Sequence, residues 1–197
     1  MVRIIGAVIV LLAVGFAGII GYPAYRRQAT ERKAIRRLKA LKASCSGRVV
    51  GPGWLRVLIW RLRGSLPIMS LTGVNSVSPE FGDEDLALLR YSTRIGNLDL
   101  DRTQVTDGGM VYLKNLREMT TLELCGTRVT DAGLAQLKHL ISLRIVTLRD
   151  TGVTDAGLAH LTGLRNLLKV DVTNTAVTEA GIARLEQALP ETEIAGP

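Results

Sequence analysis

Histidine and cysteine are the side chains best suited to acid–base, nucleophilic and metal chemistry, and this 197-residue sequence contains two of each. His139 and His160 stand at unrelated positions of the repeat described below, so nothing arranges them as a pair, and we expect both on helix surfaces. Cys45 and Cys125 are too few and too far apart for a structural zinc site or a disulfide framework. Two free thiols are compatible with a reducing compartment.

Motifs for hydrolysis or nucleotide binding are also missing from the sequence. No nucleophile motif supports Ser-His-Asp chemistry, and no glycine-rich phosphate-binding loop occurs. The acidic run Asp83, Glu84 and Asp85 could suggest a cation site, but acids in the first turn of a helix interact favourably with the helix dipole and explain the run. We therefore predict no catalytic residues, no metal and no cofactor, and expect that the chain is not an enzyme.

The polar residues that remain are positioned by a 24-residue repeat. The phrase T-x-V-T followed by Asp or Glu recurs at residues 103–107, 127–131, 151–155 and 175–179. A glycine and two leucine-like residues follow each phrase, and two apolar residues spaced two apart precede it. Self-similarity at such a period is typical of solenoid proteins.

Each repeat predicts one strand followed by one helix. Apolar residues two apart lie on one face of a strand, and the Thr-Asp step supplies oxygens that can cap a helix. Leu134, Leu137, Leu140 and Leu143 then follow one helical face. The recurrent glycine inside the helix start admits close packing between neighbouring units. One unit alone cannot bury its apolar face, whereas stacked units share a continuous core.

These units resemble leucine-rich repeats of the "VTDAGL" type, which occur in F-box substrate receptors and in short bacterial membrane-anchored proteins. The resemblance implies an α/β solenoid with parallel strands on a concave face and helices on a convex face. It covers repeats 98–121, 122–145, 146–169 and 170–193, within a domain over 74–197 that begins with a degenerate repeat at 74–97. At one position of the repeat, where other leucine-rich repeats carry Asn or Cys, this sequence carries threonine. The resemblance implies that these side chains form a structural ladder of hydroxyl groups: Thr103, Thr127, Thr151 and Thr175.

The N-terminal region, residues 1–25, predicts a transmembrane anchor. Residues 4–24 contain no charge, and about 20 apolar residues span a bilayer of about 30 Å, which is longer than the apolar core of a cleaved signal peptide. Small residues at Ala13, Ala17 and Gly21 share a helix face and could support self-association. Their presence also agrees with the ordinary composition of membrane spans.

Residues 26–47 predict a basic juxtamembrane helix at the membrane surface. Under the positive-inside rule this flank stays in the cytoplasm, so we expect a single-pass membrane protein with cytoplasmic repeats. Residues 1–64 carry 13 Lys and Arg against one acid, whereas residues 65–197 carry 12 against 17, so the high overall charge does not indicate nucleic-acid binding. The predicted membrane-surface residues are Arg26, Arg27, Arg32, Lys33, Arg36, Arg37, Lys39 and Lys42.

Residues 48–73 predict an N-terminal cap for the solenoid. The segment 54–63 has a helical pattern with Trp and Arg beside an apolar face. Two alternatives fit this pattern: a helix that caps the first repeat, or a helix in the lipid headgroup layer. At the opposite end we expect the last helix to close at 188–190 and an edge strand over 193–195.

A partner-binding surface is the remaining functional prediction. Leucine-rich-repeat proteins typically bind partners on the concave face, so the resemblance implies a membrane-anchored module for an unidentified protein partner. About six strands give a face of only about 25 Å, which favours modest affinity. The alternatives are a substrate receptor of the F-box type and a structural envelope protein without a specific partner. Side chains expected on the face are Asn97, Asp99, Asp101, Thr121, Glu123, Cys125, Ile145, Thr147, Arg149, Lys169, Asp171 and Thr173.

Overall fold

The computed structural model describes residues 36, 37, 40, 44–49, 69–75, 78–90 and 92–196. Among these residues no helix has both the length and the apolar character needed to cross a membrane. The predicted anchor over residues 4–24 and the segment 54–63 lie outside the described part of the chain.

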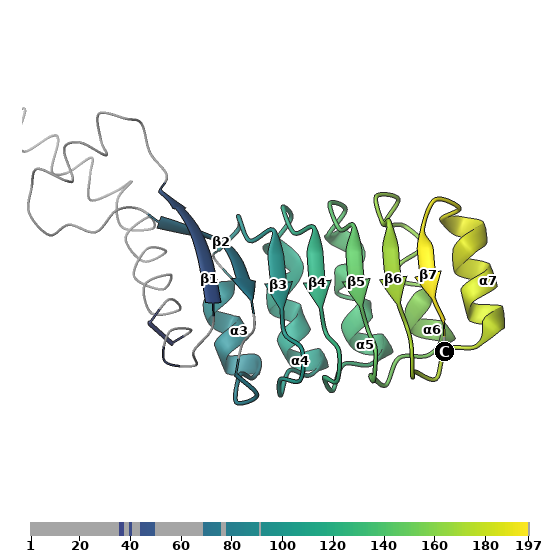
Figure 1. Cartoon of the computed structure of the whole chain (residues 1–197), viewed down its shortest axis with the longest axis horizontal. Helices are drawn as coiled ribbons and strands as arrows, with labels where there is room; N and C mark the ends of the chain where they lie inside the picture. Colours follow the sequence, from purple (N-terminus) through teal and green to yellow (C-terminus); the bar gives the residue numbers. More distant parts are fainter. Residues whose placement is uncertain are drawn as a thin grey trace, which may run out of the picture.

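One sheet runs through the described residues with its strands in chain order (Figure 1). The first strand, β1 (Ser44–Val49), is antiparallel to β2 (Met69–Asn75). Every later neighbour pair is parallel. The parallel strands that follow β2 are β3 (Asn97–Asp99), β4 (Thr121–Glu123), β5 (Ile145–Thr147), β6 (Lys169–Asp171) and β7 (Glu193–Ala195).

The strand register follows the sequence period. Leu98 lies beside Leu122, and Val146 lies beside Val170, so each residue pairs with the one 24 positions later. The strands are shorter than the apolar pairs predict, because each ends before the second apolar residue. Backbone hydrogen bonding nevertheless continues there, as in the 2.9 Å bond from the Leu100 amide to the Glu123 carbonyl.

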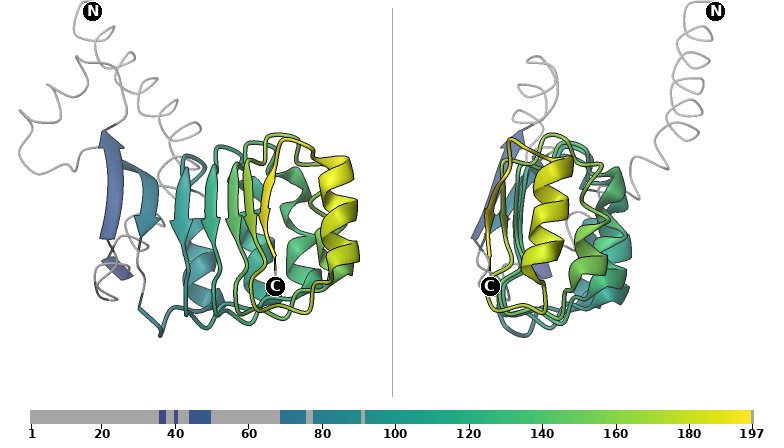
Figure 2. Two further views of the ribbon diagram at one scale, coloured as in Figure 1. Left: turned by 45° about the vertical axis from the view of Figure 1, so that its right-hand side comes forward. Right: turned by 90° about the vertical axis from the view of Figure 1, so that its right-hand side faces the viewer.

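Helices cover one face of this sheet (Figure 2). The predicted helical run through Leu143 is wrong in extent, because most repeats form one α-turn and some add a 3-10 turn. Leu140 and Leu143 lie beyond these turns but are still fully buried. The elements are α3 (Asp83–Leu89), α4 (Asp107–Met110), η1 (Val111–Asn115), α5 (Asp131–Leu134), η2 (Leu137–His139), α6 (Asp155–Leu158) and the longer α7 (Glu179–Ala188).

The degenerate repeat has the same construction as the others. Phe81, Leu86 and Leu89 are buried 24 residues before Val105, Met110 and Leu113, which are also buried. Its strand, β2, begins at residue 69, inside the range predicted to form the cap. The strand β1 likewise begins at residue 44, inside the range predicted to be a juxtamembrane helix, because the chain pairs there with β2 rather than continuing as a helix.

The threonine hydroxyls form a column of equivalent hydrogen bonds, in which Thr103, Thr127 and Thr151 are buried and Thr175 is partly buried. Each hydroxyl donates to the carbonyl three residues earlier in its own repeat. The distances are 2.7 Å from Thr103 to Leu100 and 2.7 Å from Thr127 to Leu124. Thr151 and Thr175 donate in the same way. The hydroxyls thereby satisfy carbonyl groups at the buried turn after each strand.

A second column, formed by aspartates, links each repeat to the next. The Asp131 carboxylate accepts hydrogen bonds from the Thr154 amide at 2.8 Å and from its hydroxyl at 2.7 Å. Asp83, Asp107 and Asp155 bond the next repeat in the same manner. The sequence predicts these acids as helix-start residues, in a step that can cap the helix and in a turn that suits negative charge. Their larger role is to join adjacent units, and we call these contacts the aspartate seam.

Candidate functional site on the concave sheet face

The face of the sheet opposite the helices presents polar side chains, and we call it the concave face. Strand alternation buries Leu98 and Leu100 completely while Asn97 is exposed and Asp99 and Asp101 are partly exposed. The predicted residues Thr121, Glu123, Cys125, Ile145, Thr147, Arg149, Lys169 and Thr173 are also exposed or partly exposed. Asp171 is the exception at 8% exposure, so we leave it out of the contact surface.

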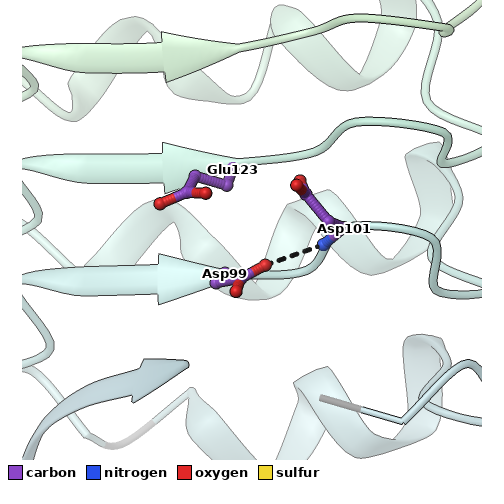
Figure 3. Close-up of side chains that lie close together, drawn as sticks. All are labelled: Asp99, Asp101 and Glu123. Carbon is purple, nitrogen blue, oxygen red and sulfur yellow. Dashed lines mark hydrogen bonds between the residues drawn. The ribbon is translucent and has the colours of Figure 1, made fainter. Parts of the chain in front are cut away.

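Three carboxylates gather on the first half of this face. Oxygen atoms of Asp99, Asp101 and Glu123 lie within 4.8 Å of one another (Figure 3). Asp99 and Glu123 occupy adjacent register positions of β3 and β4. The Asp101 amide donates to Asp99 at 3.0 Å, and the Asp101 carboxylate accepts from the Cys125 amide at 2.8 Å. These bonds fix two of the three acids to the backbone.

The three acids repel one another. Burial, and then the charges of Asp99 and Asp101, raise the pKa of Glu123 above its ordinary value. Like charges directly opposite each other across a strand pair destabilise a sheet. A positively charged group brought to this cluster would relieve the repulsion, because carboxylate oxygens can accept hydrogen bonds from ammonium or guanidinium groups.

The second half of the face carries two pairs of opposite charge. Lys169 lies beside Glu193 in the register and contacts it at 2.9 Å. Arg149 contacts Asp171 at 3.0 Å. Burial would raise the pKa of Asp171, but hydrogen bonds from Thr173 and the charge of Arg149 outweigh it and lower that pKa. The two halves of the concave face therefore differ in the balance of their charges.

A hollow of about 460 Å³ adjoins the acidic cluster. Its rim is built by turns in which Arg102, Gly126 and Asp150 adopt positive φ angles between 56° and 65°. Sequence analysis missed these turn residues, although they share one column of the 24-residue period. The hollow is lined by Asp99, Asp101, Arg102, Cys125, Gly126, Arg149 and Asp150.

The Cys125 thiol inside the hollow is not activated. Burial raises its pKa above the ordinary value, which disfavours the nucleophilic thiolate. The thiol donates to the Thr147 hydroxyl at 3.3 Å. His139 and His160 are exposed elsewhere, in η2 and in the turn after α6, and do not join the concave face. The hollow thus offers charge and shape rather than a reactive group.

The acidic run of the first repeat lies in the first turn of α3, as predicted. Asp83 bonds Thr106 in the aspartate seam. Asp85 contacts Arg37 at 2.7 Å. Of the predicted membrane-surface residues, Arg36 and Arg37 fall within the described part of the chain, and both are exposed.

Parallel strands in a 24-residue register, a helical layer and a buried hydroxyl ladder define a leucine-rich-repeat solenoid. A scan of protein-family models and a search of curated proteins gave no match to the chain. Solved structures do match it. An internalin from Listeria monocytogenes aligns with 57% of this chain at 19% identity and a TM-score of 0.50.

The leucine-rich-repeat ectodomain of the receptor kinase SOBIR1 from Arabidopsis thaliana also resembles this chain. The alignment covers 85% of this chain and 91% of that one, at 15% identity and a TM-score of 0.50. The chain spans 31% of the internalin's length. At these identities the likeness establishes the fold.

Proposed function

We propose that this chain is a non-enzymatic, membrane-anchored module that binds a protein partner through its concave face. The observation that carries the proposal is the placement of Asp99 beside Glu123, with Asp101 within 4.8 Å. This arrangement opposes folding through like-charge repulsion and would be relieved by a basic group of a partner. A partner with Lys or Arg side chains at its contact surface fits this half of the face.

The membrane part of the proposal rests on the sequence. We propose a single-pass anchor within residues 1–25 and a basic flank at the cytoplasmic leaflet, with the repeats in the cytoplasm. The similarity to short bacterial membrane-anchored leucine-rich-repeat proteins supports this arrangement. Confinement to a membrane raises the local concentration of both partners, which compensates for the modest affinity of a short face.

The experiment compares partner capture by the full chain and by a D99N/D101N/E123Q variant. Asparagine and glutamine keep the side-chain volume and an acceptor oxygen, so the backbone bonds of Asp99 and Asp101 can persist. The matched control is E118Q/E186Q/E191Q, which removes the same charge from exposed positions away from the face. Covalent crosslinking in native membranes, followed by quantitative mass spectrometry, measures the captured proteins.

The proposal expects one or a few partners to fall at least tenfold with the concave-face variant and to remain with the control. Equal capture by all three chains would contradict it and would favour a structural envelope protein without a specific partner. Topology has its own measurement. A reporter fused after Pro197 that is active only in the cytoplasm should be active, and an inactive reporter in an expressed fusion would reverse the orientation.

A further inference from the structure

Arg37, in the described part of the basic flank, forms an ion pair with the first turn of α3. The Arg37 Nε atom lies 2.7 Å from the Asp85 Oδ1 atom, and a second guanidinium nitrogen lies 3.5 Å from Oδ2. The Arg37 side chain is 48% exposed, whereas that of Asp85 is only 10% exposed. The guanidinium group is therefore accessible from solvent while its partner is held within the first turn of α3.

Asp85 does not depend on Arg37 for a hydrogen-bond partner. Its carboxylate also accepts from the Gly82 amide at 3.3 Å, closing the cap of α3. Release of Arg37 would leave this carboxylate with a backbone donor rather than as an isolated buried charge. The acidic surroundings also favour the contact, since Asp85, and more weakly Glu80 and Glu84, raise the pKa of Arg37.

Two attractions of similar size compete for Arg37. The guanidinium end of this ion pair is half exposed, and a surface ion pair shifts an equilibrium by at most about fivefold. Each basic residue close to an anionic leaflet contributes about the same factor. Neither attraction dominates, so the position of Arg37 depends on the charge of the membrane.

We propose that the Arg37 side chain exchanges between Asp85 and anionic lipid headgroups, so that membrane charge releases this side chain from α3. The inference rests on the proposed membrane anchoring and adds a regulated contact to it. On a neutral membrane the ion pair supports the first turn of α3. On an anionic membrane the arginine binds lipid and that turn opens more often.

The test uses the full chain in nanodiscs of phosphatidylcholine alone or with three parts in ten phosphatidylserine. Hydrogen exchange is measured at the α3 amides of Asp85 and Leu86, which donate to the Gly82 carbonyl at 3.0 and 3.1 Å. We expect wild-type exchange two- to fivefold faster on the anionic discs, which corresponds to the contribution of one exposed ion pair.

Two variants separate the specific contact from general charge. D85N should exchange at the same rate on both lipids, because the competing carboxylate charge is gone. E84Q removes the same charge from the adjacent exposed position and should keep the lipid dependence.

Each remaining outcome has a definite meaning. Equal wild-type rates in disc-bound protein, or loss of the difference in E84Q, would overturn the exchange while leaving the anchor in place. Failure of the chain to co-purify with the discs would overturn the membrane anchoring and the exchange together.

Discussion

The aspartate seam and the concave face lie on the same repeats but follow different rules. In the seam, one carboxylate bonds one threonine of the next repeat at every step from Asp83 to Thr178. On the concave face the corresponding positions carry Asp99, Glu123 and Thr147 along one row of the register. In the seam each carboxylate is hydrogen-bonded to the next repeat, whereas the concave face varies along the register and places like charges side by side.

The difference separates residues that hold the solenoid together from residues that the fold does not require. Each seam aspartate makes the same contact with the next repeat, so the same side chain recurs at each step. A concave-face residue points away from the core and can change without loss of packing. The Asp99 carboxylate accepts a backbone hydrogen bond, but the placement of Glu123 beside it adds like-charge repulsion rather than stability.

The largest expected effect is in the seam, at a glycine. A Cβ atom added at Gly157 would overlap the Asp131 carboxylate that bonds Thr154. Alanine normally stabilises a helix relative to glycine by about 0.5–1 kcal/mol, but here G157A should destabilise the protein by about 3 kcal/mol because charged hydrogen bonds are displaced. Urea unfolding measures the change. The control G163A, where a Cβ meets nothing within 4 Å, should stay within about 0.5 kcal/mol.

Removal of the displaced carboxylate should partly rescue that variant. D131A alone loses both bonds to Thr154 and should cost about 2 kcal/mol. In the double variant the overlap at residue 157 is gone, so the combined cost should be at least 1 kcal/mol below the sum of the single costs. Additive costs in the same unfolding assay would show that the glycine does not serve the seam.

The threonine ladder should respond less strongly than the seam. T151V removes the buried hydroxyl that donates to the Leu148 carbonyl and should cost about 1 kcal/mol. T162V removes an exposed hydroxyl that makes the same type of bond to Ala159 and should change stability by less than about 0.5 kcal/mol. Equal losses for the two variants would contradict a special role for the buried ladder.

On the concave face, removal of a charged side chain should stabilise the protein rather than destabilise it. Because folding raises the pKa of Glu123, its ionised form opposes folding above the folded pKa. E123Q should therefore stabilise the protein at pH 7 by about 0.5 kcal/mol. The gain should shrink as the pH falls through the folded pKa towards the ordinary value of 4.5. Thermal melts of E123Q and wild type at pH 7 and at pH 4.5 test this prediction. A lower melting temperature for E123Q at pH 7 would contradict the claim that the cluster opposes folding.

The smallest expected difference is the acid response of the seam. Hydrogen bonds from the Thr178 amide and hydroxyl lower the pKa of Asp155 below its ordinary value of 3.8. The ionised carboxylate therefore contributes stability above that value and loses it as the pH falls through the lower folded pKa. Melting temperatures between pH 5 and pH 2 should fall less steeply for D155N than for wild type. Parallel curves would show that Asp155 adds nothing to acid sensitivity.

Periodicity in the sequence was sufficient to predict the strands β3 to β6, the buried leucines and the column of threonines. These features depend on the spacing of residues in the sequence. Leu98 and Leu122, for example, are one period of 24 residues apart and lie side by side in the sheet. The helix lengths were harder to predict, because Leu140 and Leu143 are buried without being helical. A leucine spacing of three fits a helix and a tight turn equally well.

The contacts between repeats and between regions could not be predicted from local patterns. In the sequence Asp131 looks like an acidic residue at the start of a helix. Its contact with Thr154 arises because the next repeat stacks directly beside it. The contact of Arg37 with Asp85 joins residues 48 apart that share no motif. The residues of the concave face were predicted as a list, but the crowding of three carboxylates within 4.8 Å depends on the register of β3 and β4.

The seam has a consequence for how such a protein can change its length. Each aspartate hydrogen-bonds the threonine 23 residues later, and the contact of Asp155 with Arg184 at 3.9 Å also lies in the next repeat. These contacts therefore link nearest neighbours. Excision of 24 consecutive residues from the interior would bring an equivalent donor to an equivalent acceptor. The solenoid can therefore gain or lose multiples of 24 residues. A deletion of a different length would move the seam aspartate, threonine and glycine away from the positions at which they meet.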